Sequence, residues 1–187
     1  VQNNYFEGDM EKCGDINLEL WFSAYKDSRL AYVLADLSDD GSPELIIAAL
    51  NGKYSNAYQI YDIWGQENGA PKRIFDIGSM GYRAIYNITK DDRIVKYHSE
   101  LATWEDVPGY ENSMWIIFHE IYSVVPDTAN AKFETGFKRE DLDGEDYCYY
   151  ISEDGTEIGH FPDFVDYEKA LAENSARKDF EWTVIHD

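Results

Sequence analysis

A loop of oxygen-bearing residues between two apolar runs carries the sharpest chemical signal in this sequence. The loop reads Asp36-Leu37-Ser38-Asp39-Asp40-Gly41-Ser42-Pro43-Glu44, with side-chain oxygens at its first, third, fifth and ninth positions. A hard cation such as Ca²⁺ takes six to eight oxygen ligands, and alternate side chains of a tight loop can converge on it. Glycine at the sixth position permits the sharp turn. The acidic loop (residues 36–44) therefore predicts a Ca²⁺ site formed by the side chains of Asp36, Ser38, Asp40 and Glu44 and the carbonyl of Ser42.

Two features separate the acidic loop from an EF-hand and leave a second interpretation open. The twelfth position, counted from Asp36, is Ile47, so the bidentate glutamate of an EF-hand is absent. The flanking segments 31–35 and 45–49 are short apolar runs, which are typical of strands rather than helices. The alternative is that the acids only cap the turn of a β-hairpin and bind no ion.

Segment 32–47 resembles a known calcium-binding element, on the pattern Asp36-x-Ser38-x-Asp40-Gly41-x-x-Glu44-Leu45. It looks like the strand–loop–strand unit of FG-GAP/VCBS-type repeats. It is also similar to uncharacterised secreted or lipid-anchored domains of Gram-positive bacteria, in which such a loop follows an N-terminal helix and precedes Tyr-rich strands. The resemblance implies calcium binding and an extracellular or cell-surface location. Ser38 stands where the repeats carry Asp or Asn, and one repeat alone does not imply a β-propeller.

Two other segments share part of the pattern of the acidic loop. Ser152-Glu153-Asp154-Gly155-Thr156 matches residues 38–42, but Tyr150 stands where Asp36 would be. This segment therefore predicts a plain hairpin turn. The segment Asp141-Leu142-Asp143-Gly144-Glu145-Asp146 is acidic as well. When Gly144 is aligned with Gly41, however, Arg139 stands at the position that matches Asp36. We interpret it as a solvated loop.

The elements that position these residues are two helices and a series of strands. A stripe of Leu18, Trp21, Phe22 and Tyr25 predicts a helix over about 15–27. Residues at helical spacing near the other end predict a second helix over about 164–178. Asp163 or Asp166 would cap it, and Arg177 and Lys178 would lie in its last turn, where they complement the helix dipole.

Strand-like runs fill the interval between the two helices and one more follows them. Residues 66–69, which contain Asn68-Gly69, and residues 89–92 predict hairpin turns. Short connections favour antiparallel neighbours, and 101–112 reads as a long exposed loop. We therefore expect one α+β, β-dominated domain over 1–187, in which both helices pack on an antiparallel meander. The predicted strands are 30–35, 44–50, 57–64, 72–77, 82–87, 93–98, 114–123, 132–137, 146–152, 157–161 and 180–185.

Charge and composition narrow the classes of partner. The chain has 16 basic and 37 acidic residues and a net charge of −21, while 44% of its residues are hydrophobic. Nucleic acid and anionic membranes would repel such a chain, and no apolar run is long enough for membrane insertion. Its two cysteines, Cys13 and Cys148, either form one bridge or remain buried thiols. The start at Val1, without Met, indicates a fragment, a matured secreted chain or a chosen boundary.

No catalytic residue is assigned from the sequence. The four histidines lack paired metal spacing and are expected on strands or the surface, and no nucleophile-elbow or phosphate-loop motif occurs. Trp104 and Tyr110, in the predicted loop, are the best candidates for an exposed aromatic binding patch. The sequence favours a noncatalytic extracellular or cell-surface domain that carries one Ca²⁺ and binds a glycan or a protein. The alternatives are an acidic inhibitor or immunity-type protein that binds a basic partner, and a hydrolase with unidentified acid/base carboxylates.

Overall fold

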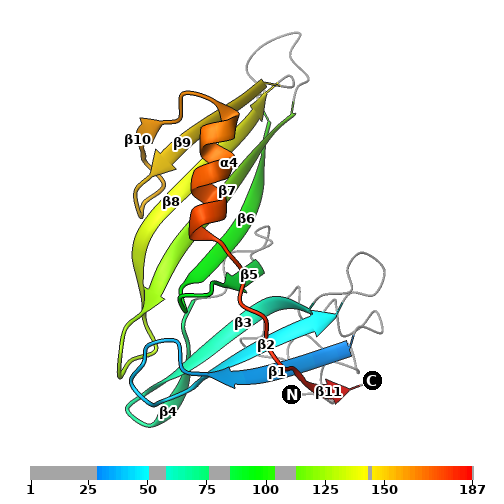
Figure 1. Cartoon of the computed structure of the whole chain (residues 1–187), viewed down its shortest axis with the longest axis vertical. Coiled ribbons are helices and arrows are strands. Elements are labelled where there is room, and N and C mark those ends of the chain that lie inside the picture. Colours follow the sequence, from blue (N-terminus) through cyan, green and yellow to red (C-terminus); the bar gives the residue numbers. More distant parts are fainter. Residues whose placement is uncertain (1–28, 51–57, 76–84, 104–112, 143–144, 187) are drawn as a thin grey trace. The chain divides into compact units, whose positions relative to one another are not determined.

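A computed structural model describes residues 29–50, 58–75, 85–103, 113–142 and 145–186. The chain divides into two compact units. Unit 1 contains residues 1–79, 124–131 and 179–187, and unit 2 contains residues 80–123 and 132–178. Each unit draws on widely separated parts of the chain, so no single linker divides them. Among the described residues the fold is β-dominated, with antiparallel strands and a C-terminal helix, as predicted (Figure 1).

The strands of unit 1 form an antiparallel sheet in the order β11-β1-β2-β3-β4. Side chains that face its core are almost completely buried, including Ala31, Ile46 and Ile60. Asn68 and Gly69 both have positive φ and form the tight turn that joins β3 to β4, which confirms the predicted hairpin. The strands are β1 (Arg29–Ala35), β2 (Glu44–Leu50), β3 (Tyr58–Glu67), β4 (Ala70–Arg73) and β11 (Thr183–His186).

Unit 2 is an antiparallel meander in which consecutive strands are neighbours from β5 to β10. The α4 helix (Phe164–Asn174) lies across one face of this sheet (Figure 1). The strands are β5 (Ile85–Ile88), β6 (Ile94–Thr103), β7 (Ser113–Val124), β8 (Ala131–Leu142), β9 (Glu145–Ile151) and β10 (Glu157–His160). The core between helix and sheet contains Val95, Ile121, Phe137, Cys148, Phe161 and Tyr167.

The α4 helix begins as predicted but ends earlier. Asp163 is the N-cap, and its carboxylate accepts a hydrogen bond from the N–H of Asp166. The helix ends at Asn174, so the prediction that Arg177 and Lys178 lie in its last turn was wrong. The reason is a competing set of partners for the backbone. The N–H of Lys178 donates to the carbonyl of Ile88 (2.8 Å), and the carbonyl of Ala176 accepts from Lys90 (2.9 Å).

Two strands extend further than the sequence indicated. The predicted loop 101–112 begins too early, because β6 continues to Thr103 and pairs with the start of β7. Asp141 and Leu142, predicted in a solvated loop, lie in β8, where Asp141 pairs with Asp146 of β9. Cross-strand pairing along both hairpins satisfies these backbone groups, and polar side chains on an outward face do not oppose it. The predicted strand 72–77 is shorter and earlier, as β4.

Several predictions fall outside the described residues. These include the N-terminal helix over 15–27 and Cys13. Cys148 is a buried free thiol, which is one of the two alternatives that the sequence left open. Of the helical segments that the structure describes, none is long and apolar enough to cross a membrane.

Candidate metal-binding site

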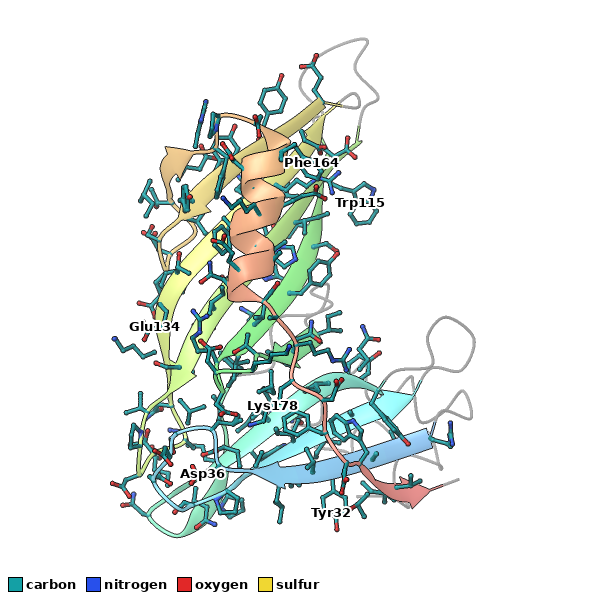
Figure 2. The ribbon with its side chains drawn as sticks, in the orientation of Figure 1. Tyr32, Asp36, Trp115, Glu134, Phe164 and Lys178 are labelled. Carbon is teal, nitrogen blue, oxygen red and sulfur yellow. The ribbon has the colours of Figure 1, made fainter. Side chains whose placement is uncertain are left out.

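The acidic loop closes the hairpin between β1 and β2. The two strands pair in continuous register from Arg29 with Leu50 to Ala35 with Glu44, so the loop starts and ends at neighbouring backbone positions. Leu37 is buried, and this anchors the start of the loop. Figure 2 shows Asp36 where the chain leaves β1. Asp39 and Gly41 both have positive φ, which wraps the chain tightly.

The first and last carboxylates of the loop accept hydrogen bonds from its own backbone. The two oxygens of Asp36 accept from the N–H of Asp40 (3.2 Å) and the N–H of Gly41 (2.7 Å). Glu44 is buried at the start of β2, and its Oε2 accepts from the N–H of Leu37 (2.8 Å). These bonds fix both carboxylates at the neck of the loop.

Asp40 joins the acidic loop to a distant segment. Its Oδ1 accepts from the N–H of Ser42 (2.7 Å), and its Oδ2 accepts from the N–H of Asp127 (2.6 Å). Asp127 lies in the turn between β7 and β8, which belongs to unit 1. A side chain at Gly65 of β3 would approach Ala129 of this turn to 3.2 Å, so glycine there allows the close contact. Asp127 was not among the predicted site residues, because no local pattern signals a contact across 87 positions.

The electrostatics of the loop reflect its crowded negative charge. Burial raises the pKa of Glu44, and the charges of Asp40 and Asp36 raise it further, against the opposing hydrogen bond from Leu37. The pKa of Asp40 is lowered, chiefly by the N–H of Asp127 and then by that of Ser42. Within the described ranges, no Lys, Arg or His side chain forms an ion pair with Asp36, Asp40 or Glu44.

Two observations bear on whether these residues fit a cation. The Oγ atom of Ser38 is buried and, among the described residues, has no hydrogen-bond partner of good geometry, although its hydroxyl lies near enough to Asp40 to help lower the pKa of that carboxyl. Against this, the described residues contain no group of three or more His, Cys, Asp or Glu side chains placed to hold a metal. The oxygens of the loop are thus close in sequence, but its carboxylates accept hydrogen bonds from backbone N–H groups and are not placed around one point.

The turn at residues 152–156 gives an internal comparison. Asp154 Oδ1 accepts from the N–H of Thr156 (3.1 Å), as Asp40 Oδ1 does from Ser42. Ser152 and Thr156 also pair through their backbone, and Gly155 has positive φ. This segment is the plain hairpin turn that the sequence predicted. It shares the central turn of the acidic loop but lacks acids at the positions of Asp36 and Glu44.

The predicted aromatic patch of Trp104 and Tyr110 lies outside the described residues. Other aromatic side chains are exposed on unit 2, namely Trp115 (51%), Tyr147 (42%) and Tyr150 (38%). Trp115 lies in a predicted strand, and no exposure was predicted for it, because strand alternation alone does not tell which face of a sheet is covered. Tyr150 stacks on Phe161 with ring centroids 4.0 Å apart.

All four histidines lie in strands, as expected. His98 and Glu120 lie on the face of the unit 2 sheet opposite α4, with Nδ1 of His98 3.9 Å from Oε2 of Glu120. Lys96 binds the same oxygen at 2.8 Å, and Tyr122 donates its hydroxyl to it at 3.2 Å. Burial lowers the pKa of His98. Because Glu120 is already paired with Lys96, this cluster has the character of a cross-strand network.

Comparison with known proteins gives no relative. No family model matches the chain, and neither a curated protein nor a solved structure matches it.

Proposed function

We propose that this chain is a noncatalytic extracellular or cell-surface binding domain whose acidic loop is stabilised by one Ca²⁺ ion. The side chains of Asp36, Ser38, Asp40 and Glu44 and the carbonyl of Ser42 would hold the ion. The main supporting observation is that the three carboxylates proposed as ligands share one loop while no described basic side chain pairs with them. Calcium would supply the missing positive charge, with several oxygen ligands from one tight turn.

The hydrogen bonds now made by the carboxylates are compatible with this role. Each ionised carboxylate has about four acceptor sites, so Asp36, Asp40 and Glu44 retain free lone pairs after accepting backbone N–H groups. The buried Oγ of Ser38, which has no hydrogen-bond partner of good geometry among the described residues, adds a neutral oxygen. Because Asp40 also binds the N–H of Asp127, an ion in the loop would stabilise the contact between two distant segments.

A melting series tests the calcium proposal. With a dissociation constant near ~10⁻⁴ M, about 2 mM Ca²⁺ stabilises the fold by roughly 1.8 kcal/mol, which for a chain of this size is about 4–7 °C in Tm. Mg²⁺ should do less, because it requires a tighter octahedron and dehydrates reluctantly. Melting is measured in Ca²⁺, in Mg²⁺ and in chelator.

The variants are Asp40→Ala and its matched control Asp154→Ala. Both remove a carboxylate that holds a hairpin turn, but only Asp40 has acidic partners at the loop ends. The advantage of Ca²⁺ over Mg²⁺ should disappear in Asp40→Ala and persist in Asp154→Ala. If wild type lacks that advantage, or if Asp40→Ala keeps it, the acidic loop is only a hairpin turn.

A second candidate function is that of an acidic protein that binds a basic partner, as inhibitors and immunity proteins do. It is favoured by the distribution of charge in unit 2. No Lys or Arg occurs between Arg139 and Lys169, while this interval contains eleven acidic residues. Such a surface accelerates association with a positively charged partner and disfavours an anionic one.

A further inference from the structure

The outer edge of β9 is only partly covered by β10. The strand β10 pairs with the last three residues of β9, through Glu157 with Ile151, Gly159 with Tyr150, and His160 with Tyr149. One more bond follows, from the N–H of Phe161 to the carbonyl of Cys148 (2.9 Å). Pro162 has no N–H and ends the pairing. Among the residues that the structure describes, no strand pairs with this edge at residues 145–147.

The backbone of Asp146 faces this uncovered edge. The carbonyl of Cys148 points to the β10 side, because it accepts from Phe161. Backbone groups of alternate residues in an antiparallel strand point to the same side. The N–H and carbonyl of Asp146 therefore point outward, while Tyr147 pairs with Glu140 of β8. Asp146 and Tyr147 are both exposed, so the edge is accessible.

A pocket of about 250 Å³ lies beside the same edge. Its lining combines aromatic and apolar side chains, such as Tyr147 and Phe161, with the polar side chains of Asp146, His160 and Asp163. Burial raises the pKa of the Cys148 thiol to about 11, so this group stays neutral. The pocket thus offers a partly apolar and partly acidic surface for a side chain of an added strand, next to backbone groups that could pair with that strand.

The surrounding charge selects the kind of partner. The eleven acidic residues between Arg139 and Lys169 include Glu145, beside Tyr147, and Asp163, at the start of α4. Three of the eleven form local ion pairs, since Asp146 binds Arg139 (2.6 Å), and Glu140 (2.5 Å) and Glu157 (2.7 Å) share Lys138. Excess negative charge remains on both sides of the open edge. An approaching anionic segment is repelled, and a cationic segment is attracted.

We propose that the open edge of β9 at residues 145–147 binds an extended basic peptide segment, which adds a strand beside β9 and places one of its side chains in the adjoining pocket. Strand addition uses main-chain hydrogen bonds for affinity and pockets for alternate side chains for specificity. This inference deepens the proposed binding role, on which it rests, by naming a surface and a partner class. The peptide site does not depend on the acidic loop. A negative result in the calcium melting series would therefore not affect the peptide proposal, and a negative peptide-binding result would not affect the calcium proposal.

The probe is a fluorescein-labelled octapeptide of alternating Lys and Val, measured by anisotropy with the full chain. The decisive pair of variants is Asp146→Pro and Asp146→Ala. Both lose the carboxylate that binds Arg139, but only proline also removes the outward N–H, and the ladder to β8 is kept. Binding should weaken by at least about tenfold in Asp146→Pro, and by less than about threefold in Asp146→Ala.

Two further probes keep the test decisive if Asp146→Pro does not fold. Two Lys-Val octapeptides are N-methylated, one on the Lys residues and one on the Val residues. Each keeps the charge of the parent peptide but loses half of its N–H donors. One of the two should bind wild type at least about tenfold more weakly than the parent peptide does. A Glu-Val octapeptide should not bind. The proposal is overturned if the Lys-Val probe does not bind wild type, if both methylated probes bind as well as their parent, or if Asp146→Pro binds like Asp146→Ala.

Discussion

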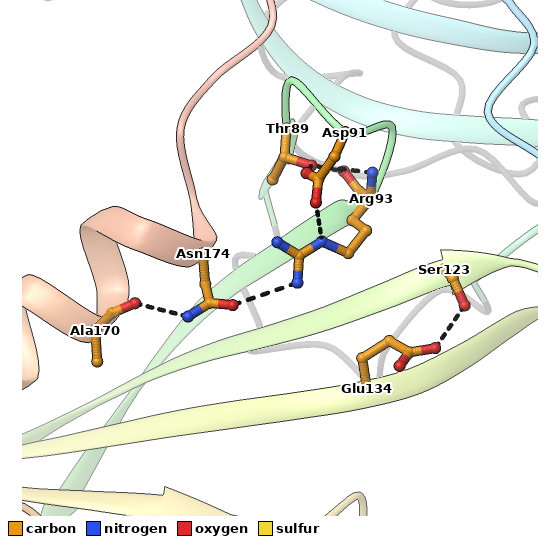
Figure 3. Close-up of polar contacts among 7 residues, drawn as sticks. All are labelled: Thr89, Asp91, Arg93, Ser123, Glu134, Ala170 and Asn174. Atoms are coloured by element: carbon orange, nitrogen blue, oxygen red, sulfur yellow. Dashed lines mark hydrogen bonds and ion pairs between the residues drawn. The ribbon is translucent and has the colours of Figure 1, made fainter.

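Asn174, the last residue of α4, holds the guanidinium of Arg93 on the neighbouring hairpin. Nη1 of Arg93 donates to Oδ1 of Asn174 (3.3 Å), and Nδ2 of Asn174 donates to the carbonyl of Ala170 (2.8 Å), as Figure 3 shows. Arg93 is itself positioned by Asp91, whose Oδ2 lies 2.8 Å from its Nε. One side-chain amide therefore binds a carbonyl of the last helical turn and attaches the helix to the turn between β5 and β6.

Replacing Asn174 should loosen this attachment. We expect Asn174→Ala to lower the free energy of unfolding by about 1–2 kcal/mol, because two hydrogen bonds of ordinary strength are lost. Glu173→Ala, on the exposed side of the same turn, is the control and should change stability by less than about 0.5 kcal/mol. Urea denaturation of both variants measures the difference. Equal effects would mean that helix propensity, and not the contact with Arg93, determines the result.

Gly136 of β8 should not tolerate a methyl group. A Cβ atom there would lie 2.6 Å from Cγ1 of Ile151, which is almost completely buried in β9. We expect Gly136→Ala to cost about 1–3 kcal/mol through overpacking. In the double variant with Ile151→Ala the two costs should be less than additive. At Gly159 the same atom would meet only Tyr150 at 3.6 Å, an ordinary contact, so Gly159→Ala is the control for thermal melting.

His119 should make unit 2 sensitive to mild acid. Its pKa is lowered to about 4, first because burial disfavours the imidazolium and then because of the charge of His98. The unfolded chain takes up this proton at pH near ~6.5, so stability is complete above that pH and is lost as the pH falls toward about 4.

The pH dependence can be measured by comparison with His119→Gln. Between pH 7.5 and 5, the free energy of unfolding of wild type should fall by about 2 kcal/mol more than that of the variant. Only wild type has an imidazole at this site, which the unfolded chain protonates more readily than the folded chain does. Carboxylates shared by both proteins cancel in the difference. Urea titrations at the two pH values give the result, and parallel pH profiles would show that the folded chain protonates His119 as readily as the unfolded chain does.

Arg73 should stabilise unit 1, because it neutralises the buried carboxylate of Asp62. Its Nε and Nη2 bind the two oxygens of Asp62 at 2.7 and 2.8 Å, and Asp62 is only 4% exposed. Removing the cation in Arg73→Ala leaves this carboxylate unpaired and should cost about 3–5 kcal/mol at neutral pH. Burial already raises the pKa of Asp62, so in the variant it should take up a proton readily, and stability should partly return as the pH falls. Adding Asp62→Asn should remove that pH dependence.

Much of the local structure follows from residues that are close in sequence. The turn at Asn68-Gly69 forms because these two residue types tolerate positive φ, and both adopt it. Asp163 caps α4 because a short carboxylate can reach the free N–H groups of the first helical turn. The apolar runs on either side of the acidic loop form β1 and β2, the strands predicted at 30–35 and 44–50.

The candidate site was only partly predictable. The spacing of Asp36, Asp40 and Glu44 identified the loop, but not the bond from Asp127 that occupies one oxygen of Asp40. The open edge of β9 left no sequence signal either, because it depends on where β10 stops beside its neighbour. Pro162 can be recognised as the end of the pairing between β10 and β9 only when it is known that these two strands are neighbours.

The sequence by itself determined the alternation of apolar and polar residues in the strands, the turns, the helix cap and the negative charge. Each of these depends on residues a few positions apart or on composition alone. Tertiary structure decided which distant groups satisfy one another. Lys178 leaves the helix to pair with Ile88 and Asp92, and β11 joins β1 across most of the chain. These choices arise because every buried N–H and carbonyl needs a partner, and several segments of similar local preference compete to provide it.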